Sequence, residues 1–144
     1  MKPVVLHVED DPNDALLVTL AFRKLDLAPQ LRSVDNDPKA RAYLSGTAPF
    51  SNRTDHPAPG FVFLDLKLHG SSGFELLAWV RRQPVFRYLP VVILSSSNRS
   101  EDISQAYDLG ANSYISKPSS LEGIMQMVRT AHHYWMGFNL QTAS

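Results

Sequence analysis

The sequence of 144 residues contains no cysteine, which excludes disulfide bonds, thiol catalysis and metal sites built on thiolates. Long apolar runs are also absent, and the run at 91–94 is far too short to span a bilayer. Neither sign of charge is in excess, since 14 basic residues balance 14 acidic ones, so we expect no nucleic-acid partner and no membrane surface. The N-terminus lacks the basic and then apolar segments of a signal peptide. These absences predict a cytoplasmic protein, and the length fits one domain over residues 1–144.

What is present is an alternation of short apolar runs with segments of helical periodicity. The runs that predict strands cover residues 3–8, 31–34, 61–65, 90–95 and 112–116. The segments that predict helices cover residues 11–25, 37–46, 74–83, 100–109 and 119–136. This alternation predicts an α/β domain with a parallel, doubly wound sheet and helices on both faces. Its core would span about residues 3–136, followed by a short C-terminal tail.

Local signals predict where helices begin and where a long loop lies. Asp-Pro pairs at 11–12 and 37–38 predict helix starts, with Asp11 as the N-cap of the first helix. Ser119 and Glu122 have the spacing of a capping box ahead of the last helix. The segment 45–60 is rich in proline, serine and asparagine and predicts an extended loop that is functional or mobile.

Polar side chains stand at the carboxyl end of four predicted strands, where sheets of this type bind ligands. They are carboxylates, hydroxyls and one amine: Glu9, Asp10, Asp11, Asp65, Ser95, Ser96, Ser97 and Lys117. Carboxylate oxygens suit Mg²⁺, while a lysine and a hydroxyl suit phosphoryl oxygens. Taken singly, each has an ordinary explanation as a helix cap, a loop residue or a surface charge. Together, at four strand ends, they predict a site for a divalent cation and a phosphoryl group.

This ordered set resembles the receiver domains of response regulators, the phosphoacceptor modules of two-component signalling. The resemblance covers about residues 3–136 and implies a flavodoxin-like receiver fold, as in chemotaxis regulators, with strand order 2-1-3-4-5. By position it assigns an acidic pair, a phosphoacceptor, a hydroxyl, a switch aromatic, a lysine and a glycine: Glu9 and Asp10, Asp65, Ser95, Tyr114, Lys117 and Gly73. His69 departs from the family pattern, because many members have proline there, and Glu9 replaces the commoner aspartate.

The resemblance implies that Asp65 accepts a phosphoryl group from a sensor histidine kinase in a reaction that needs Mg²⁺. The ion would be held by four groups: Asp10, Asp65, the backbone carbonyl of Lys67, and Glu9 through water. Lys117 would pair with the phosphoryl group, Ser95 would swing toward it, and Tyr114 would turn inward. The face formed by the fourth helix, fifth strand and fifth helix would then change shape. The Lys117–Pro118 peptide bond is expected to be cis, as is typical of the family.

The sequence ends about eight residues beyond the last predicted helix, so we expect no effector domain and signalling through contacts. That helix carries an apolar stripe expected in the core: Leu121, Ile124, Met125, Val128, Ala131 and Trp135. A second line, of Met127, Tyr134 and Phe138, is either further core packing or the surface of a homodimer. With the long loop and the aromatic tail, these features are similar to stand-alone regulators of phytochromes, which implies a phytochrome as the kinase.

Three alternatives accompany this prediction. The protein could be a relay intermediate that passes the phosphoryl group to a histidine phosphotransfer protein. A hydrolase of the haloacid-dehalogenase type also uses a nucleophilic aspartate and Mg²⁺, but it needs a second aspartate where Lys67 stands. A flavodoxin-like binder of small molecules would need a loop rich in serine, threonine and glycine in place of the acidic run. The residues therefore favour a phosphoacceptor that is not a turnover enzyme.

Overall fold

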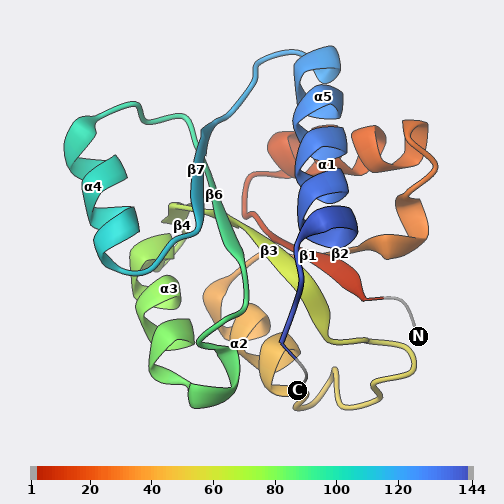
Figure 1. Ribbon diagram of the computed structural model, residues 1–144, viewed down its shortest axis with the longest axis vertical. Helices are drawn as coiled ribbons and strands as arrows, with labels where there is room; N and C mark the ends of the chain where they lie inside the picture. Colours follow the sequence, from red (N-terminus) through yellow and green to blue (C-terminus); the bar gives the residue numbers. More distant parts are fainter. Residues whose placement is uncertain (1–2, 143–144) are drawn as a thin grey trace.

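The centre of the computed structural model, which describes residues 3–142, is a parallel sheet of five strands (Figure 1). The strands are β1 (Val4–Val8), β2 (Leu31–Val34), β3 (Pro59–Asp65), β6 (Val91–Ser95) and β7 (Ser113–Ser116). They lie in the order β2-β1-β3-β6-β7, and every neighbouring pair is parallel. Counted along the chain, this is the predicted order 2-1-3-4-5, so the fold prediction is confirmed.

Five α-helices connect and follow the strands, as predicted. They are α1 (Pro12–Lys24), α2 (Asp37–Ser45), α3 (Gly73–Arg82), α4 (Ser100–Asp108) and α5 (Leu121–His132). The last helix continues as a π-helix, η3 (His133–Phe138), and two short 3₁₀ turns are η1 (Ala28–Gln30) and η2 (Pro84–Phe86). A small hairpin of β4 (Lys67–Leu68) and β5 (Ser71–Ser72) was not predicted, because strands of two residues carry too little alternation to be recognised.

The helices cover both faces of the sheet, α1 and α5 on one face and α2, α3 and α4 on the other (Figure 1). Each face has its own apolar cluster, because successive side chains of a strand point to opposite sides. In β1, Val4, Leu6 and Val8 join the cluster beneath α2, α3 and α4, while Val5 joins the one beneath α1 and α5. All five residues of β1 are buried, which explains its unbroken apolar character apart from His7.

The second line of apolar residues on the last helix is divided between the core and the surface. Met127 is 7% exposed and belongs to the core, whereas Tyr134 and Phe138 are 50% and 67% exposed. The change coincides with the passage from α5 into the wider turns of η3, where the helical period that was used to align the three residues no longer holds. The core interpretation is therefore confirmed for Met127 only.

The N-cap of α1 was predicted correctly, but two other caps were displaced by one residue. Asp11 caps α1, and its side chain accepts hydrogen bonds from the backbone N–H groups of the second and third helical residues. Asn36 caps α2, where Asp37 was expected, and Ser120 caps α5, where Ser119 was expected. In both cases two neighbouring residues are able to cap, and sequence spacing does not distinguish between them.

The long loop between α2 and β3 is attached to the end of α2 by side-chain hydrogen bonds. The guanidinium group of Arg53 donates to the backbone carbonyls of Tyr43 and Leu44 at 2.8 Å each, and to that of His56 at 3.0 Å. These bonds satisfy carbonyls at the end of α2, which have no partner within the helix. Gly46 ends the helix in the left-handed conformation, with φ of 68°, where a side chain would be strained.

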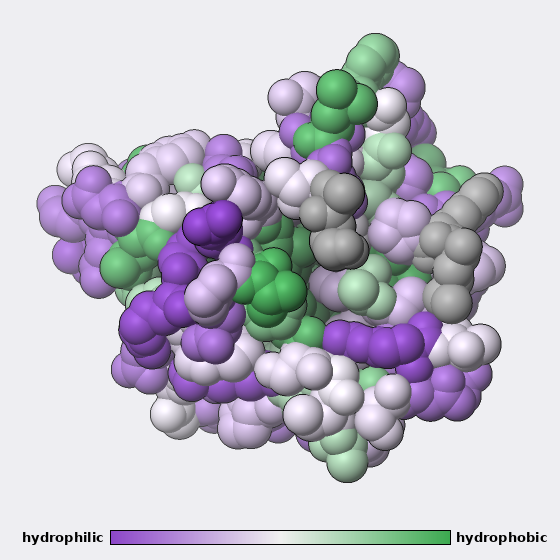
Figure 2. All heavy atoms as spheres, turned by 60° about the horizontal axis from the view of Figure 1, so that its bottom comes forward, coloured by the Kyte–Doolittle hydropathy of each residue, from purple (hydrophilic) through white to green (hydrophobic). Residues whose placement is uncertain are grey.

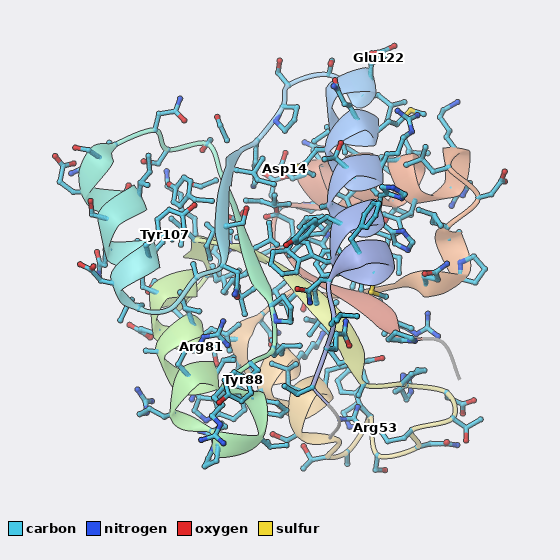
Figure 3. All side chains as sticks on the ribbon, in the orientation of Figure 1. Asp14, Arg53, Arg81, Tyr88, Tyr107 and Glu122 are labelled. Atoms are coloured by element: carbon cyan, nitrogen blue, oxygen red, sulfur yellow. The ribbon has the colours of Figure 1, made fainter. Side chains whose placement is uncertain are left out.

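A second arginine, on α3, forms hydrogen bonds with the segment that follows α4. Arg81 donates to the backbone carbonyls of Gly110 at 2.9 Å, Phe86 at 3.0 Å and Leu89 at 2.9 Å, and to the side chain of Asn112 at 2.8 Å. In Figure 3, Arg81 is labelled on α3, in the lower half of the molecule, whereas Asp14 is labelled in the upper half. The C-terminal end of α4 is thus held firmly in place, on the side away from the site described below.

The end of the sheet where the strands begin has a hollow in which apolar side chains gather among hydrophilic ones (Figure 2). A groove of about 290 Å³ lies there, and its lining includes Pro59, Phe86, Tyr88 and Pro90. The side chain of Gln141 donates to a backbone carbonyl at this end, so the C-terminal segment crosses it.

Within residues 3–142, no helix has the length and apolar character that crossing a membrane requires.

Candidate functional site

The carboxyl ends of the strands bring four of the predicted residues together. Glu9 follows β1, Asp65 ends β3, Ser95 ends β6 and Lys117 follows β7. Because the strands pair in parallel, these four residues lie at the same end of the sheet. The backbone N–H of Lys117 also donates to the carbonyl of Ser95 at 2.8 Å. A cavity of about 450 Å³ opens at this edge, lined by Asp10, Asp11, Pro12, Asp14, Asp65, Lys67, Leu68, His69, Ser96 and Lys117. The edge predicted to bind ligands therefore carries an open cavity.

Lys117 is the electrostatic centre of this edge. Its Nζ donates to Asp65 Oδ2 at 2.7 Å, to Glu9 Oε1 at 2.8 Å and to Asp14 Oδ2 at 2.9 Å. The side chains of Glu9 and Asp65 are almost completely buried, whereas that of Asp14 is 40% exposed. In Figure 3, Asp14 lies near the start of α1, at the upper end of the sheet. One amine thus compensates carboxylates that come from three different elements.

Glu9, Asp65 and Lys117 shift one another's pKa values. Burial, reinforced by the hydrogen bond with Asp65, raises the pKa of Glu9 to about 8. Burial would also raise the pKa of Asp65, but hydrogen bonds from Glu9, Lys117 and the backbone of Lys67 outweigh it and lower that pKa. Burial opposes the charge of Lys117, yet its hydrogen bonds to Asp65, Glu9 and Asp14 raise its pKa. Asp65 is therefore kept as an anion at neutral pH, which is the form a nucleophile needs.

Three carboxylates form a group that fits a hard divalent cation. Oxygen atoms of Glu9, Asp10 and Asp65 all lie within 4.8 Å of one another, a spacing at which one ion can contact all three. Oxygen ligands of this kind match Mg²⁺. Lys67 lines the same cavity, and its backbone N–H donates to Asp65 Oδ1 at 3.0 Å. The backbone N–H of His69 donates to Asp10 Oδ2 at 2.8 Å, and its ring Nδ1 contacts the same oxygen.

The predicted hydroxyl and switch aromatic are connected through one serine. Ser95 is buried, and its Oγ accepts from the backbone N–H of Ser97 at 3.0 Å. The hydroxyl of Tyr114 donates to the backbone carbonyl of Ser97 at 2.9 Å. Ser97 Oγ in turn donates to Asp102, in the first turn of α4, at 2.6 Å. The end of β6, the side chain on β7 and the start of α4 therefore share one hydrogen-bond network.

Some predicted residues lie elsewhere or differ in detail. Asp11 is occupied in capping α1, as its ordinary structural explanation predicted. Ser96 lines the cavity, whereas Ser97 belongs to the network that leads to α4. The prediction of a cis bond between Lys117 and Pro118 is wrong: the cis peptide bond among the described residues joins Ala48 and Pro49. Bonds that precede proline differ by only about 1 kcal/mol between the two isomers, so surrounding contacts decide which one occurs.

Three further residues at the site were not predicted from the sequence. Asp14 reaches Lys117 because the first turn of α1 directs it toward the strand ends, which a helical period measured from Asp11 could have suggested. In the sequence, His69 stands out only as a departure from the proline that many family members have there. His7 is fully buried on β1, and neither ring nitrogen has a hydrogen-bond partner among the described residues. Burial, followed by the charge of Lys117, lowers the pKa of His7 to about 4.

Gly73 stands where the backbone of α3 meets the phosphoacceptor strand. Its N–H donates to the carbonyl of Leu66 at 2.8 Å, and an added Cβ would lie 2.2 Å from the backbone oxygen of Asp65. Since backbone atoms cannot rotate away, Gly73→Ala is expected to destabilise the protein by about 2–3 kcal/mol and to displace Asp65. Urea unfolding measures the first effect, and the Mg²⁺ dissociation constant measures the second. Ala78→Gly, at a half-buried position of α3, should cost only about 1 kcal/mol, and an equal loss in both variants would contradict the clash.

Comparisons with known proteins agree with this fold. The family model described as the response regulator receiver domain matches residues 5–129. The probable methanogenesis regulatory protein FilR2 of Methanothrix harundinacea is 32% identical, covering 94% of this chain and 85% of that protein. Response regulator RPA3017, from red light signaling of R. palustris, has a TM-score of 0.90 at 30% identity and covers 99% of both chains. The phosphorylated cyanobacterial phytochrome response regulator RcpA has a TM-score of 0.87 at 29% identity, covering 99% of this chain and 100% of that one.

Proposed function

Because this chain belongs to the response regulator receiver family, we propose that Asp65 is the residue through which it accepts a phosphoryl group. The observation that carries the proposal is the position of Asp65. One of its oxygens lies 2.7 Å from Lys117 Nζ, and the carboxylate also belongs to the group that fits a cation. With a cation held by that group, positive charge would flank the carboxylate on two sides, the ion on one and Lys117 on the other.

The reaction is a transfer between a donor imidazole and Asp65. An oxygen of the carboxylate forms a bond to phosphorus as the bond between phosphorus and the histidine nitrogen of the kinase breaks. The electron pair of the broken bond stays on the imidazole, which then takes up a proton from solvent. Lys117 neutralises charge on the phosphoryl oxygens, and hydrogen bonds to Asp65 keep that carboxylate ionised and oriented.

Asp10, Asp65 and Glu9 would hold Mg²⁺, with the backbone carbonyl of Lys67 as a further ligand and Glu9 contributing through water. When bound, the ion offsets the negative charge that gathers on the transferred group. The donor set supports this assignment, because it consists of carboxylates without sulfur. In addition, His69 engages one oxygen of Asp10 and so restrains its orientation.

The switch would run from Ser95 to the face formed by α4, β7 and α5. If the Ser95 hydroxyl turns toward the phosphoryl group, it gives up the hydrogen bond from Ser97. Ser97 also contacts Tyr114 and Asp102, so this change reaches both β7 and the start of α4. The Tyr114 ring already packs against the cluster beneath α2, α3 and α4. The inward turn would therefore be a tightening of this position rather than a large rotation.

The partner that supplies the phosphoryl group would be a sensor histidine kinase of the phytochrome type. RPA3017 and RcpA, which resemble this chain over nearly its whole length, are described as regulators of red light signaling and of a phytochrome. FilR2 is described as a methanogenesis regulator, so the family fold by itself does not select the signal. The exposed Tyr134 and Phe138 support output through protein contacts, in a homodimer or with a relay protein, rather than through enzymatic turnover.

Incubation with a small phosphodonor and Mg²⁺, followed by intact mass measurement, tests this function. We expect one added phosphoryl group on the wild-type protein, removed by hydroxylamine, which cleaves acyl phosphates. Asp65→Asn should remain unmodified, because the amide is not a nucleophile, whereas Asp35→Asn on the same edge should be modified like the wild type. An unmodified wild-type protein, or an Asp65→Asn variant that still takes up the group, would overturn the assignment.

A further inference from the structure

Lys117 has no donor to spare for a phosphoryl group. A lysine ammonium has three N–H donors, and Nζ of Lys117 uses them on Asp65, Glu9 and Asp14 at 2.7, 2.8 and 2.9 Å. A phosphoryl oxygen that pairs with Lys117 must therefore displace one of these three contacts. Asp65 is the proposed phosphoacceptor, and Glu9 belongs to the cation group. Asp14 has neither role.

Asp14 is also the partner of Lys117 that returns to water most readily. Its side chain is 40% exposed, against 1% for Glu9 and 8% for Asp65. Separating a buried carboxylate from its cation leaves an uncompensated charge, whereas an exposed carboxylate is solvated at once. Asp14 comes from the first turn of α1 and lines the open cavity, where solvent reaches it.

We propose that Asp14 is the exchangeable partner of Lys117, released when a phosphoryl oxygen takes its place. The proposal rests on the proposed function of Asp65 and adds a residue that controls how strongly the phosphoryl group is held. Asp14 acts through Lys117 and is a positioning residue. It keeps the ammonium group next to Asp65 in the unmodified protein and competes with the phosphoryl group for the same donor. The free energy of the Asp14–Lys117 contact therefore lowers the free energy gained when the phosphoryl group binds Lys117.

The test uses beryllofluoride, which forms a phosphoryl-like adduct with aspartate, in the presence of Mg²⁺. Asp14→Asn is expected to bind it about threefold to fivefold more tightly than the wild type, the range that an exposed ion pair supplies. Asp14→Glu restores the carboxylate and should return the dissociation constant toward that of the wild type. The dissociation constant for Mg²⁺ alone should change less than about twofold, since Asp14 lies outside the cation group. Fluorine NMR measures the first constant and calorimetry the second.

Asp35→Asn is the matched control, because Asp35 follows β2 at the same edge and pairs with Lys39 at 3.1 Å rather than with Lys117. It should leave beryllofluoride binding unchanged. The proposal is overturned if Asp14→Asn binds as the wild type or more weakly, or if Asp35→Asn tightens binding equally. Asp14→Ser serves as a second variant, and urea unfolding verifies that each variant folds. A wild-type protein that binds no beryllofluoride would refute the function of Asp65 itself, an outcome distinct from unchanged binding in Asp14→Asn.

Discussion

Replacing Lys117 by methionine is expected to lower the free energy of unfolding at pH 7 by about 3–5 kcal/mol, the cost of leaving the buried carboxylate of Asp65 without its cation. Methionine keeps much of the length of the side chain but supplies no donor to Glu9 and Asp65, which are almost completely buried. Phosphoryl uptake should be lost as well, because Asp65 loses the positive charge beside it. Urea unfolding at pH 7 measures the first effect, and intact mass after treatment with a phosphodonor measures the second.

The loss of stability in this variant should shrink as the pH falls. Glu9, with a pKa of about 8, already carries a proton near pH 7 in the wild type, so the two proteins differ at Asp65. Without Lys117, burial raises the pKa of Asp65 above that of the unfolded chain, so the folded variant binds a proton more readily. Lowering the pH then favours the folded variant, and the gap to the wild type should narrow between pH 7 and about pH 4. Lys39→Met is the control, because Lys39 and Asp35 form an exposed pair that contributes at most about 1 kcal/mol. Equal losses at Lys117 and Lys39 would rule out the central role of Lys117.

The second large effect is expected at His7. An imidazole that is fully buried without a hydrogen-bond partner stays neutral, and its pKa falls from 6.5 to about 4. The unfolded chain takes up a proton near pH 6.5, whereas the folded chain resists until about pH 4. The stability that comes from this neutral form is thus present above pH 6.5 and is lost as the pH falls through that window. The shift corresponds to a loss of about 3 kcal/mol by pH 4.

His7→Ile should remove this part of the acid sensitivity. Isoleucine suits a buried strand position and brings no polar atom, so stability at pH 7 should stay within about 1 kcal/mol of the wild type. Unfolding by urea at pH 7 and at pH 4 should show that the variant loses about 3 kcal/mol less than the wild type over this interval. His133→Gln, on an exposed position of η3, should leave the pH dependence unchanged. An identical decline in the wild type and in His7→Ile would show that the imidazole is not held neutral.

The fold, and the position of four predicted residues at one edge of the sheet, could be predicted from the sequence because the signals are local. Unbroken apolar runs predicted the buried strands, and helical periodicity between them predicted the crossovers. Once the strands are parallel, the residue that follows each one must lie at the same edge. Glu9, Asp65, Ser95 and Lys117 therefore converge without any knowledge of their side-chain conformations. Their roles remain a prediction that the phosphorylation experiment tests.

What the sequence could not predict depends on distances across the fold. The displaced caps at Asn36 and Ser120, the isomer before Pro118 and the fastening of the long loop by Arg53 each depend on contacts between neighbouring elements. The pairing of Asp14 with Lys117 spans 103 positions in the chain, and no spacing rule connects the two. Nothing in the sequence distinguishes His7 from the other residues of its buried strand. The absence of a hydrogen-bond partner among the described residues is a property of its surroundings in the fold.

The acidic residues at 9–14 illustrate which features can be predicted from the sequence and which depend on the tertiary structure. From sequence, the run separates into two carboxylates for a cation, Glu9 and Asp10, and a helix cap, Asp11, because apolar periodicity and capping preferences act over a few residues. Only the tertiary structure shows that Asp14 joins Lys117, that His69 engages Asp10, and that burial raises the pKa of Glu9. Charge interactions and desolvation depend on which groups lie close together in space. The packing of α1, β3 and β7 determines which groups these are.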